Sequence, residues 1–165
     1  MTTTVYDKTK KLLTSDSRWS YNEDFGVLYV DDIGFDKIEK AIGQHAEGYV
    51  FLFAGNSGVI QLWKTFIRSS PKPGAPIPTC HGIAILAVHA ETGEVVLDYG
   101  PGIRLPNAAQ PTIRFAGTGS VHAAQCWHSN GCARKAVDSA KDLDPFSGGE
   151  VKFFELASGN HNLHV

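Results

Sequence analysis

The sequence has little of the positive charge that marks a nucleic-acid-binding protein. Its 165 residues carry a formal net charge of −2, and its basic residues gather only in short runs such as Lys8-Thr9-Lys10-Lys11. A nucleic-acid surface usually shows a basic excess or a basic stripe, so we predict no nucleic-acid partner. We interpret the lysine-rich run as a solvated hairpin turn.

Long apolar runs and a secretory signal are also lacking. An apolar run such as Tyr49 to Phe53 is the length of a strand, far below the roughly 20 residues that span a membrane. The segment from Met1 to Tyr6 lacks the basic region and apolar core of a signal peptide. The odd number of cysteines, Cys80, Cys126 and Cys132, suits free thiols in a reducing compartment. We therefore expect a cytoplasmic protein without a membrane partner.

The cysteines and histidines do not form a recognisable metal-binding pattern. Cys126 and Cys132 lie near His122 and His128, but their spacing matches no common zinc-ligand arrangement. Two histidines six positions apart do not share a helix face. Nothing in the sequence orients Cys80-His81 as a nucleophile and its base. We predict no metal and no cofactor.

The composition that is present is typical of a globular protein. Hydrophobic residues make up 42% and charged residues 19%, and the length suits one domain over residues 1–165. Alternating apolar, β-branched and aromatic residues predict strands at 3–6, 12–14, 26–30, 37–41, 49–53, 83–88, 95–99, 113–116 and 151–156. Apolar spacing of three and four residues predicts helices at 57–68, 121–128 and 133–143, and the prolines at 71–78 predict a loop.

The order of these elements favours one fold class. Strands cluster with hairpin links, and the helices come between the clusters. This arrangement favours an antiparallel α+β layered fold over a doubly wound parallel sheet.

Four short polar segments could contribute to a site. Threonines follow Met1 directly, Asp16-Ser17-Arg18 follows the first hairpin, and Ala54-Gly55-Asn56 lies where a strand meets a helix. A last segment, 144–149, joins the final helix to the final strand. Each alone has a structural interpretation, such as a turn cap or a glycine needed for backbone geometry.

Together and in this order, the segments resemble the catalytic β subunits of the proteasome and the related bacterial threonine protease subunit that partners an ATPase unfoldase. The matching segments are Thr2-Thr3, Asp16-Ser17-Arg18, Lys37-Ile38-Glu39-Lys40, Ala54-Gly55-Asn56, Gly117-Thr118-Gly119-Ser120 and Asp144-Pro145-Phe146-Ser147-Gly148-Gly149. The resemblance implies the fold of the N-terminal-nucleophile (Ntn) hydrolases, a four-layer αββα sandwich of antiparallel sheets.

The resemblance also implies a catalytic role for four residues. Thr2, exposed after removal of Met1, would be the nucleophile, with its own α-amine as the base. Lys37 would disfavour protonation of that amine, and Asp16 would keep Lys37 charged and in place. The backbone N–H of Gly55 would receive the developing oxyanion.

Further positions follow from the same resemblance. Thr118, Asp144 and Ser147 match polar groups that orient the terminal amine. The family usually has serine at the first of these positions, and threonine keeps the hydroxyl while adding a methyl group. Arg18 is assigned to a structural salt bridge.

Three aromatic or polar residues match positions near the substrate cleft. These are Trp19, Ser20 and Phe53. Phe53 would narrow the pocket for the residue before the cut, but the sequence equally allows a core aromatic there.

The function implied is an N-terminal-threonine endopeptidase acting on peptides or unfolded proteins. The expected partners are further copies of the chain in a ring homo-oligomer and an ATPase unfoldase. Two alternatives remain: an inactive protein of proteasome fold serving as a scaffold, inhibitor or immunity subunit, and an amidase for small molecules. Departures from the family are short central helices, the loop from Pro71 to Pro78 in place of helix and turn, and a brief end after Leu156.

Overall fold

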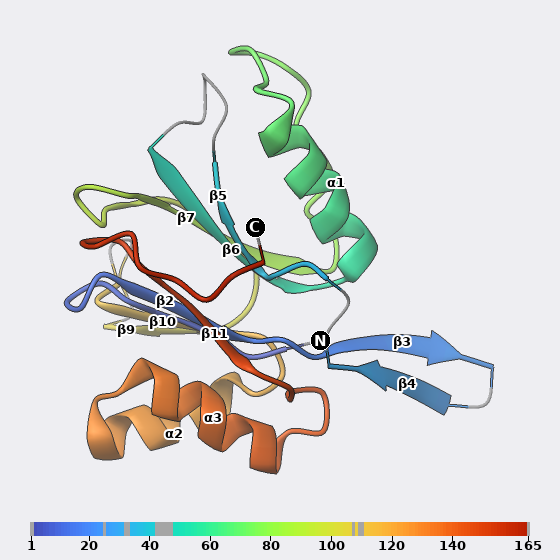
Figure 1. Ribbon diagram of the computed structural model, residues 1–165, viewed down its shortest axis with the longest axis vertical. Helices are drawn as coiled ribbons and strands as arrows, with labels where there is room; N and C mark the ends of the chain where they lie inside the picture. The colour runs from blue at the N-terminus through green and yellow to red at the C-terminus, as the bar shows by residue number, and fades with distance from the viewer. Residues whose placement is uncertain are drawn as a thin grey trace.

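The computed structural model describes residues 2–24, 26–31, 34–41, 48–106, 108 and 111–164. Two antiparallel sheets pack face to face (Figure 1). One helix lies outside the four-stranded sheet, and two helices lie outside the five-stranded sheet. This is the four-layer α+β sandwich that the sequence resemblance implied. Met1, whose removal the catalytic hypothesis requires, lies outside the described residues.

One sheet has five strands, and the first strand of the chain lies in its centre. Its strands are β1 (Thr4–Asp7), β2 (Leu12–Asp16), β9 (Ile103–Leu105), β10 (Ile113–Ala116) and β11 (Val151–Glu155), in the order β11-β2-β1-β10-β9. The register sets Thr4 opposite Ser15 on one side and Ala116 on the other. The pairing continues past the strand, since the Asp16 N–H donates to the Thr3 carbonyl at 3.0 Å. The first residues of the chain therefore lie beside Asp16.

The other sheet has four strands and leads directly into the first helix. Its strands are β5 (Ile38–Lys40), β6 (Tyr49–Gly55), β7 (Ile83–His89) and β8 (Val95–Tyr99), paired in that order. Helix α1 (Ser57–Arg68) follows β6, and the Asn56 side chain caps it by accepting from the Val59 N–H at 3.1 Å. Its buried face includes Ile60, Trp63 and Ile67, which belong to the same apolar cluster as Phe53 of β6.

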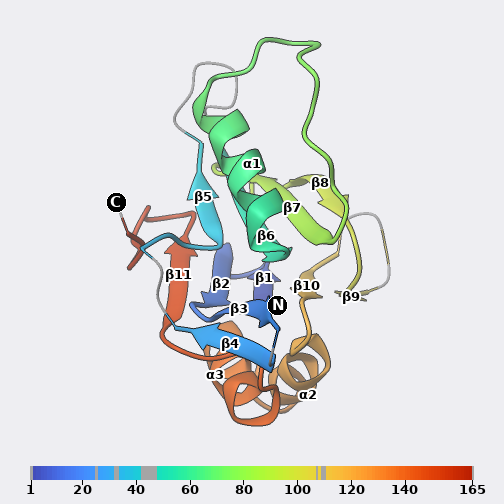
Figure 2. The ribbon, with the colours of Figure 1, turned by 90° about the vertical axis from the view of Figure 1, so that its right-hand side faces the viewer.

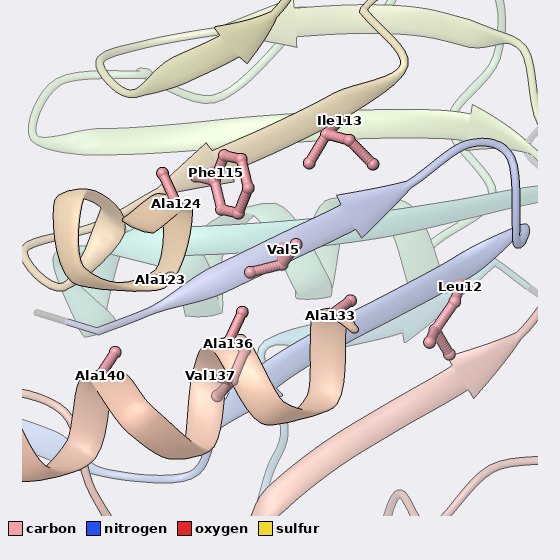
Figure 3. Close-up of a cluster of buried hydrophobic side chains, with 10 residues drawn as sticks. All are labelled: Val5, Leu12, Ile113, Phe115, Ala123, Ala124, Ala133, Ala136, Val137 and Ala140. Atoms are coloured by element: carbon pink, nitrogen blue, oxygen red, sulfur yellow. The ribbon is translucent and has the colours of Figure 1, made fainter. Parts of the chain in front are cut away.

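Helices α2 (Ser120–Asn130) and α3 (Ala133–Leu143) cover the outer face of the five-stranded sheet. Figure 3 shows the buried cluster between them and the sheet, formed by Val5, Leu12, Ile113, Phe115, Ala123, Ala124, Ala133, Ala136, Val137 and Ala140. The helices present mostly alanine, whose small side chain allows them to approach the strands closely. Gly131, with φ of 63°, ends α2 in the left-handed conformation that glycine adopts without strain.

A two-stranded ribbon extends beyond the layers. Its strands are β3 (Trp19–Glu23) and β4 (Gly26–Val30), which pair only with each other among the described strands (Figures 1 and 2). All predicted strands and helices are present with small shifts at their ends, and residues 69–82 form the predicted loop. Strands β3 and β9 were not predicted. In the described part of the chain, no helix is long and apolar enough to cross a bilayer.

Candidate active site

Three predicted site residues meet where the two sheets approach the N-terminus. Thr2 precedes β1, Asp16 ends β2, and Lys37 directly precedes β5. The β1–β2 hairpin brings Thr2 and Asp16 together because antiparallel strands align their opposite ends. Lys37 comes from the other sheet, where its carbonyl accepts from the Phe53 N–H at 2.8 Å. All three side chains are buried.

The Thr2 hydroxyl lies between an ammonium group and a carboxylate. Lys37 Nζ donates to Thr2 Oγ1, and the Thr2 hydroxyl donates to Asp16 Oδ1. Lys37 also forms an ion pair with Asp16 Oδ1 at 2.8 Å, and the two side chains are 1% and 0% exposed. A third bond joins Lys37 Nζ to the Arg18 carbonyl at 2.5 Å. The hydroxyl, the cation and the anion form one compact group shielded from water.

Burial acts on this group electrostatically. It lowers the pKa of Lys37, while the charge of Asp16 and its hydrogen bond oppose that change. Asp16 is in turn held by two backbone donors, the N–H of Thr3 on Oδ1 and that of Gly148 on Oδ2, both at 2.9 Å. Such donors and the ammonium compensate the carboxylate for its loss of water.

A second polar cluster lies next to the first. Asp144 Oδ2 accepts from the Thr118 hydroxyl at 2.6 Å and from the Ser147 hydroxyl at 2.7 Å. The Ser147 oxygen is also 2.6 Å from Thr3 Oγ1. Gly119 leaves room for this series of hydrogen bonds, because a Cβ at that position would overlap the Thr3 hydroxyl. The structure thus brings Thr118, Asp144 and Ser147 together beside the first threonines.

Thr3 was not predicted to take part in the site. Its backbone N–H binds Asp16 and its hydroxyl contacts Ser147, so it joins the two polar clusters. The signal for Thr3 was the Thr2-Thr3 pair in the sequence. Strand alternation would place only one of these two neighbours on the site's face, so it does not predict Thr3 once Thr2 is assigned. In the structure, Thr3 contacts the site with both its backbone and its side chain.

Gly55 ends β6 at the boundary between two cavities. Its φ is +119°, and a Cβ would collide with the Gly82 carbonyl oxygen, so no other residue fits without displacement. A cavity of about 690 Å³ is lined by Ser20, Tyr21, Gly55, Asn56, Ser57, Val59, Thr79, His81, Gly82 and Phe146. A second cavity, of about 440 Å³, also includes Gly55, together with Gly117 and Thr118. The backbone of Gly55 is therefore approachable from two sides.

The predicted cleft residues occupy different environments. Ser20 lines the 690 Å³ cavity. Trp19 is buried with its ring 5.0 Å from Lys37 Nζ, so it shields the ammonium from solvent. Phe53 is fully buried in the core and lines neither cavity, which matches the core alternative that the sequence left open. Arg18 forms the expected salt bridge, to Asp31 at 2.5 Å.

No metal site is evident in the part of the chain that the structure describes. There, no group of three His, Cys, Asp or Glu side chains is placed to hold an ion. Cys80, Cys126 and Cys132 are free thiols.

The layered architecture is the HslV/proteasome β-type fold, as comparison with solved structures shows. No protein-family model matches the chain, and no curated protein matches it. Solved structures do match. Eukaryotic HslV from Trypanosoma brucei has 16% identity and a TM-score of 0.53, with 93% of this chain and 99% of that chain covered.

A second kind of neighbour is BPH from Thiobacillus denitrificans. One BPH structure has 13% identity and a TM-score of 0.59, covering 96% of this chain and 100% of that one. A second, in complex with epoxomicin, has 12% identity and a TM-score of 0.58, covering 93% of this chain and 97% of that one. At these identities the likeness establishes the fold, and the chemistry has to be argued from the residues of this chain.

Proposed function

We propose that the protein is a threonine-type peptidase whose nucleophile is Thr2 once Met1 has been removed. One observation carries the proposal: the Thr2 hydroxyl is bonded to both Lys37 and Asp16 in a buried group. A threonine hydroxyl needs an adjacent base, and an N-terminal threonine carries one in its own α-amine. The ammonium of Lys37 favours the neutral, proton-accepting form of that amine.

The reaction would begin with attack of Thr2 Oγ1 on a peptide carbonyl carbon. The hydroxyl proton passes to the α-amine of Thr2, and the carbonyl oxygen becomes an oxyanion. The backbone N–H of Gly55 would stabilise that oxyanion, a type of contact that lowers barriers by about 3–4 kcal/mol. Thr118, Asp144 and Ser147 would hold the amine in position through their hydrogen-bonded chain.

The intermediate would then collapse with cleavage of the C–N bond. The departing amine takes the proton from the Thr2 ammonium, leaving an ester between the acyl half of the peptide and Thr2 Oγ1. Water attacks this ester with the freed amine as base, releases the acid and restores the hydroxyl. One BPH structure is in complex with epoxomicin, and we propose that epoxomicin also binds this chain, at Thr2.

Peptide hydrolysis by purified, processed protein tests the proposal. A panel of peptides and small amides is compared for wild type, Thr2→Ala and Thr2→Ser, and the mass of the N-terminus is measured on the same samples. We expect cleavage of peptides, loss of at least about 100-fold in kcat/KM for Thr2→Ala, and partial retention for Thr2→Ser. Equal activity of Thr2→Ala would contradict the proposal. A chain isolated with Met1 in place would instead favour the non-catalytic scaffold, and cleavage of small amides alone would favour the amidase.

Self-association is part of the proposal, and the β3–β4 ribbon supports it. Val27, Leu28 and Tyr29 are 39%, 49% and 39% exposed on a ribbon that extends from the sandwich. Two-stranded ribbons are marginal in water unless they pack against something, and exposed apolar side chains favour a protein partner. We propose that the ribbon contacts a second copy in a ring. The mass of the protein in solution should exceed that of a monomer, and Leu28→Lys on the ribbon should lower that mass. An ATPase unfoldase remains a partner expected from the resemblance, to be tested by co-purification.

A further inference from the structure

The 440 Å³ cavity was not anticipated from the sequence. It is lined by Ala54, Gly55, Cys80, His81, Gly82, Ile83, Ala84, Tyr99, Gly100, Pro101, Gly102, Gly117, Thr118 and Ser120. These residues come from β6, β7 and β8 of the four-stranded sheet, from the connections that follow β8 and β10, from the start of α2 and from the end of the proline-rich loop. The volume falls within the range of about 300–1,000 Å³ that is typical of ligand pockets.

The cavity borders the candidate site at three points. Gly55 is the candidate oxyanion donor, and Thr118 is bonded to Asp144 at 2.6 Å. The third is Gly117, whose backbone lies so close to Thr2 that a Cβ would overlap the Thr2 carbonyl oxygen. A peptide bound with its carbonyl at Thr2 and Gly55 therefore has one of its halves directed toward this cavity.

The chemistry of the proposed reaction determines which half that is. The departing amine must receive its proton from the Thr2 ammonium, so the departing half lies on the side where that group is held. Thr118, which belongs to the chain that would orient the amine, lines this cavity and not the larger one. The larger cavity, with Ser20 and Tyr21, is left for the acyl half.

The walls of the cavity select for chemistry as well as for position. Ile83, Ala84, Tyr99 and Pro101 provide an apolar surface, and the lining residues include no Asp, Glu, Lys or Arg. A carboxylate or ammonium placed here would lose water without gaining a carboxylate, ammonium or guanidinium partner from the lining, which is unfavourable. An apolar side chain is stabilised there by its removal from water.

One wall is fixed by a buried arginine. Arg114 Nη2 donates to the Gly100 carbonyl at 3.2 Å and to the Pro101 carbonyl at 3.0 Å, and Arg114 is only 2% exposed. Asp98 holds the same guanidinium at 2.9 Å. The loop that supplies Cys80 and His81 to another wall is tied down by the Trp63 indole N–H, which donates to the Thr79 carbonyl at 2.9 Å. Both walls are therefore set before a ligand arrives.

We propose that this cavity is a pocket for the departing half of the substrate and binds the uncharged apolar side chain that directly follows the bond to be cut. This inference rests on the proposed function, since it assigns the departing half of the same substrate. It makes the protein selective for leucine-like or phenylalanine-like residues on that side and against acidic and basic ones.

The test compares peptides that are identical before the cut and differ in the residue after it. Wild type should cleave those with Leu or Phe at least tenfold better in kcat/KM than those with Asp or Lys, the discrimination that one pocket can supply. Cys80→Phe, which fills the pocket from the loop, should lower kcat/KM for the Leu peptide at least tenfold. It should lower the rate of Thr2 modification by a peptide epoxyketone much less, because that reagent has no departing half. Cys126→Ser on α2, outside both cavities, should leave the preference unchanged.

A second measurement separates failure of the pocket from failure of the peptidase. Full-length protein carrying Thr2→Ala, Cys126→Ser and Cys132→Ser keeps Cys80 as its one thiol. Leucinamide should slow alkylation of Cys80 by N-ethylmaleimide at least threefold, and the acidic aspartic acid α-amide should not. Absence of an epoxyketone adduct on processed wild type rejects the peptidase alone. Equal alkylation with both amides, or cleavage indifferent to the residue after the cut, overturns the pocket.

Discussion

Lys37 and Asp16 form an ion pair of 2.8 Å that is sealed from solvent and directly touches the Thr2 hydroxyl. The two residues lie on different sheets, so this pair joins the inner layers of the sandwich at the candidate nucleophile. Buried pairs of this kind seldom stabilise a protein more than apolar residues would, but breaking one leaves an uncompensated charge. The proposed chemistry at Thr2 would give this pair a role other than stability.

The first prediction concerns this pair. Lys37→Met or Asp16→Asn alone should cost about 3–5 kcal/mol of unfolding free energy, since each leaves its partner buried without a counter-charge. The double variant should cost clearly less than the sum of the two. Urea unfolding of all four proteins measures the coupling. Strict additivity would mean that the pair is not formed in solution.

A second prediction tests the close approach of the backbone to Thr2. Gly117 has φ of +91°, and a Cβ there would strike the Thr2 carbonyl, whereas Gly131 has φ of +63° with open space around it. Gly131→Ala should therefore cost about 1 kcal/mol from backbone strain alone. Gly117→Ala should cost several kcal/mol because it adds a collision with main-chain atoms. Thermal unfolding of the two variants compares them, and equal losses would contradict the packing of Gly117 on Thr2.

A third prediction uses the two cations that share Glu39. Lys64 is 2% exposed and 3.0 Å from Glu39, while Arg68 is 57% exposed and 2.6 Å from the same carboxylate. Lys64→Met should cost more unfolding free energy than Arg68→Met, which should cost at most about 1 kcal/mol, because Lys64 is the buried partner and Arg68 the exposed one. Chemical denaturation distinguishes them. If both substitutions caused only small losses of unfolding free energy, the result would contradict the burial of Lys64.

A fourth prediction concerns acid stability and Asp98. Burial raises the pKa of Asp98, but hydrogen bonds and charge from Arg104 and Arg114 outweigh it, and the net pKa is lowered. A carboxyl with a lowered folded pKa contributes stability above its unfolded pKa of about 3.9, and that stability is lost as pH falls through the folded value. The unfolding free energy of wild type should thus fall steeply below about pH 4.

The matching variants isolate this contribution. Asp98→Asn should be less stable than wild type at neutral pH and should show a shallower loss of stability on acidification, measured by urea unfolding from pH 7 to pH 3. Asp142→Asn, an exposed change on α3, should keep the wild-type profile. Parallel profiles for Asp98→Asn and wild type would contradict the role of Asp98.

The sequence predicted the layers and the polar group at Thr2 for identifiable reasons. Period-two and period-3.6 patterns located the elements, and six ordered segments placed Asp16 and Lys37 together although 21 positions separate them. Whether the cluster performs catalysis stays a prediction.

Other features depend on tertiary contacts that the sequence does not display. No pattern in the sequence indicates that Lys64 is buried. Its partner Glu39 lies 25 positions earlier on another element. Strand β9 has only three residues, too few to alternate visibly, and β3 is half of a ribbon stabilised mainly by its partner strand. For Phe53, apolar spacing could not distinguish a pocket wall from the core.

One measurement tests the central claim most directly. Protein purified from cells is treated with a peptide epoxyketone, and intact mass followed by peptide mapping locates any adduct. A chain without Met1 that carries a single adduct on Thr2, retained in Thr2→Ser and lost in Thr2→Ala, is the predicted result. A processed chain that forms no adduct, or one that is modified equally after Thr2→Ala, would contradict the assignment of Thr2 as the nucleophile.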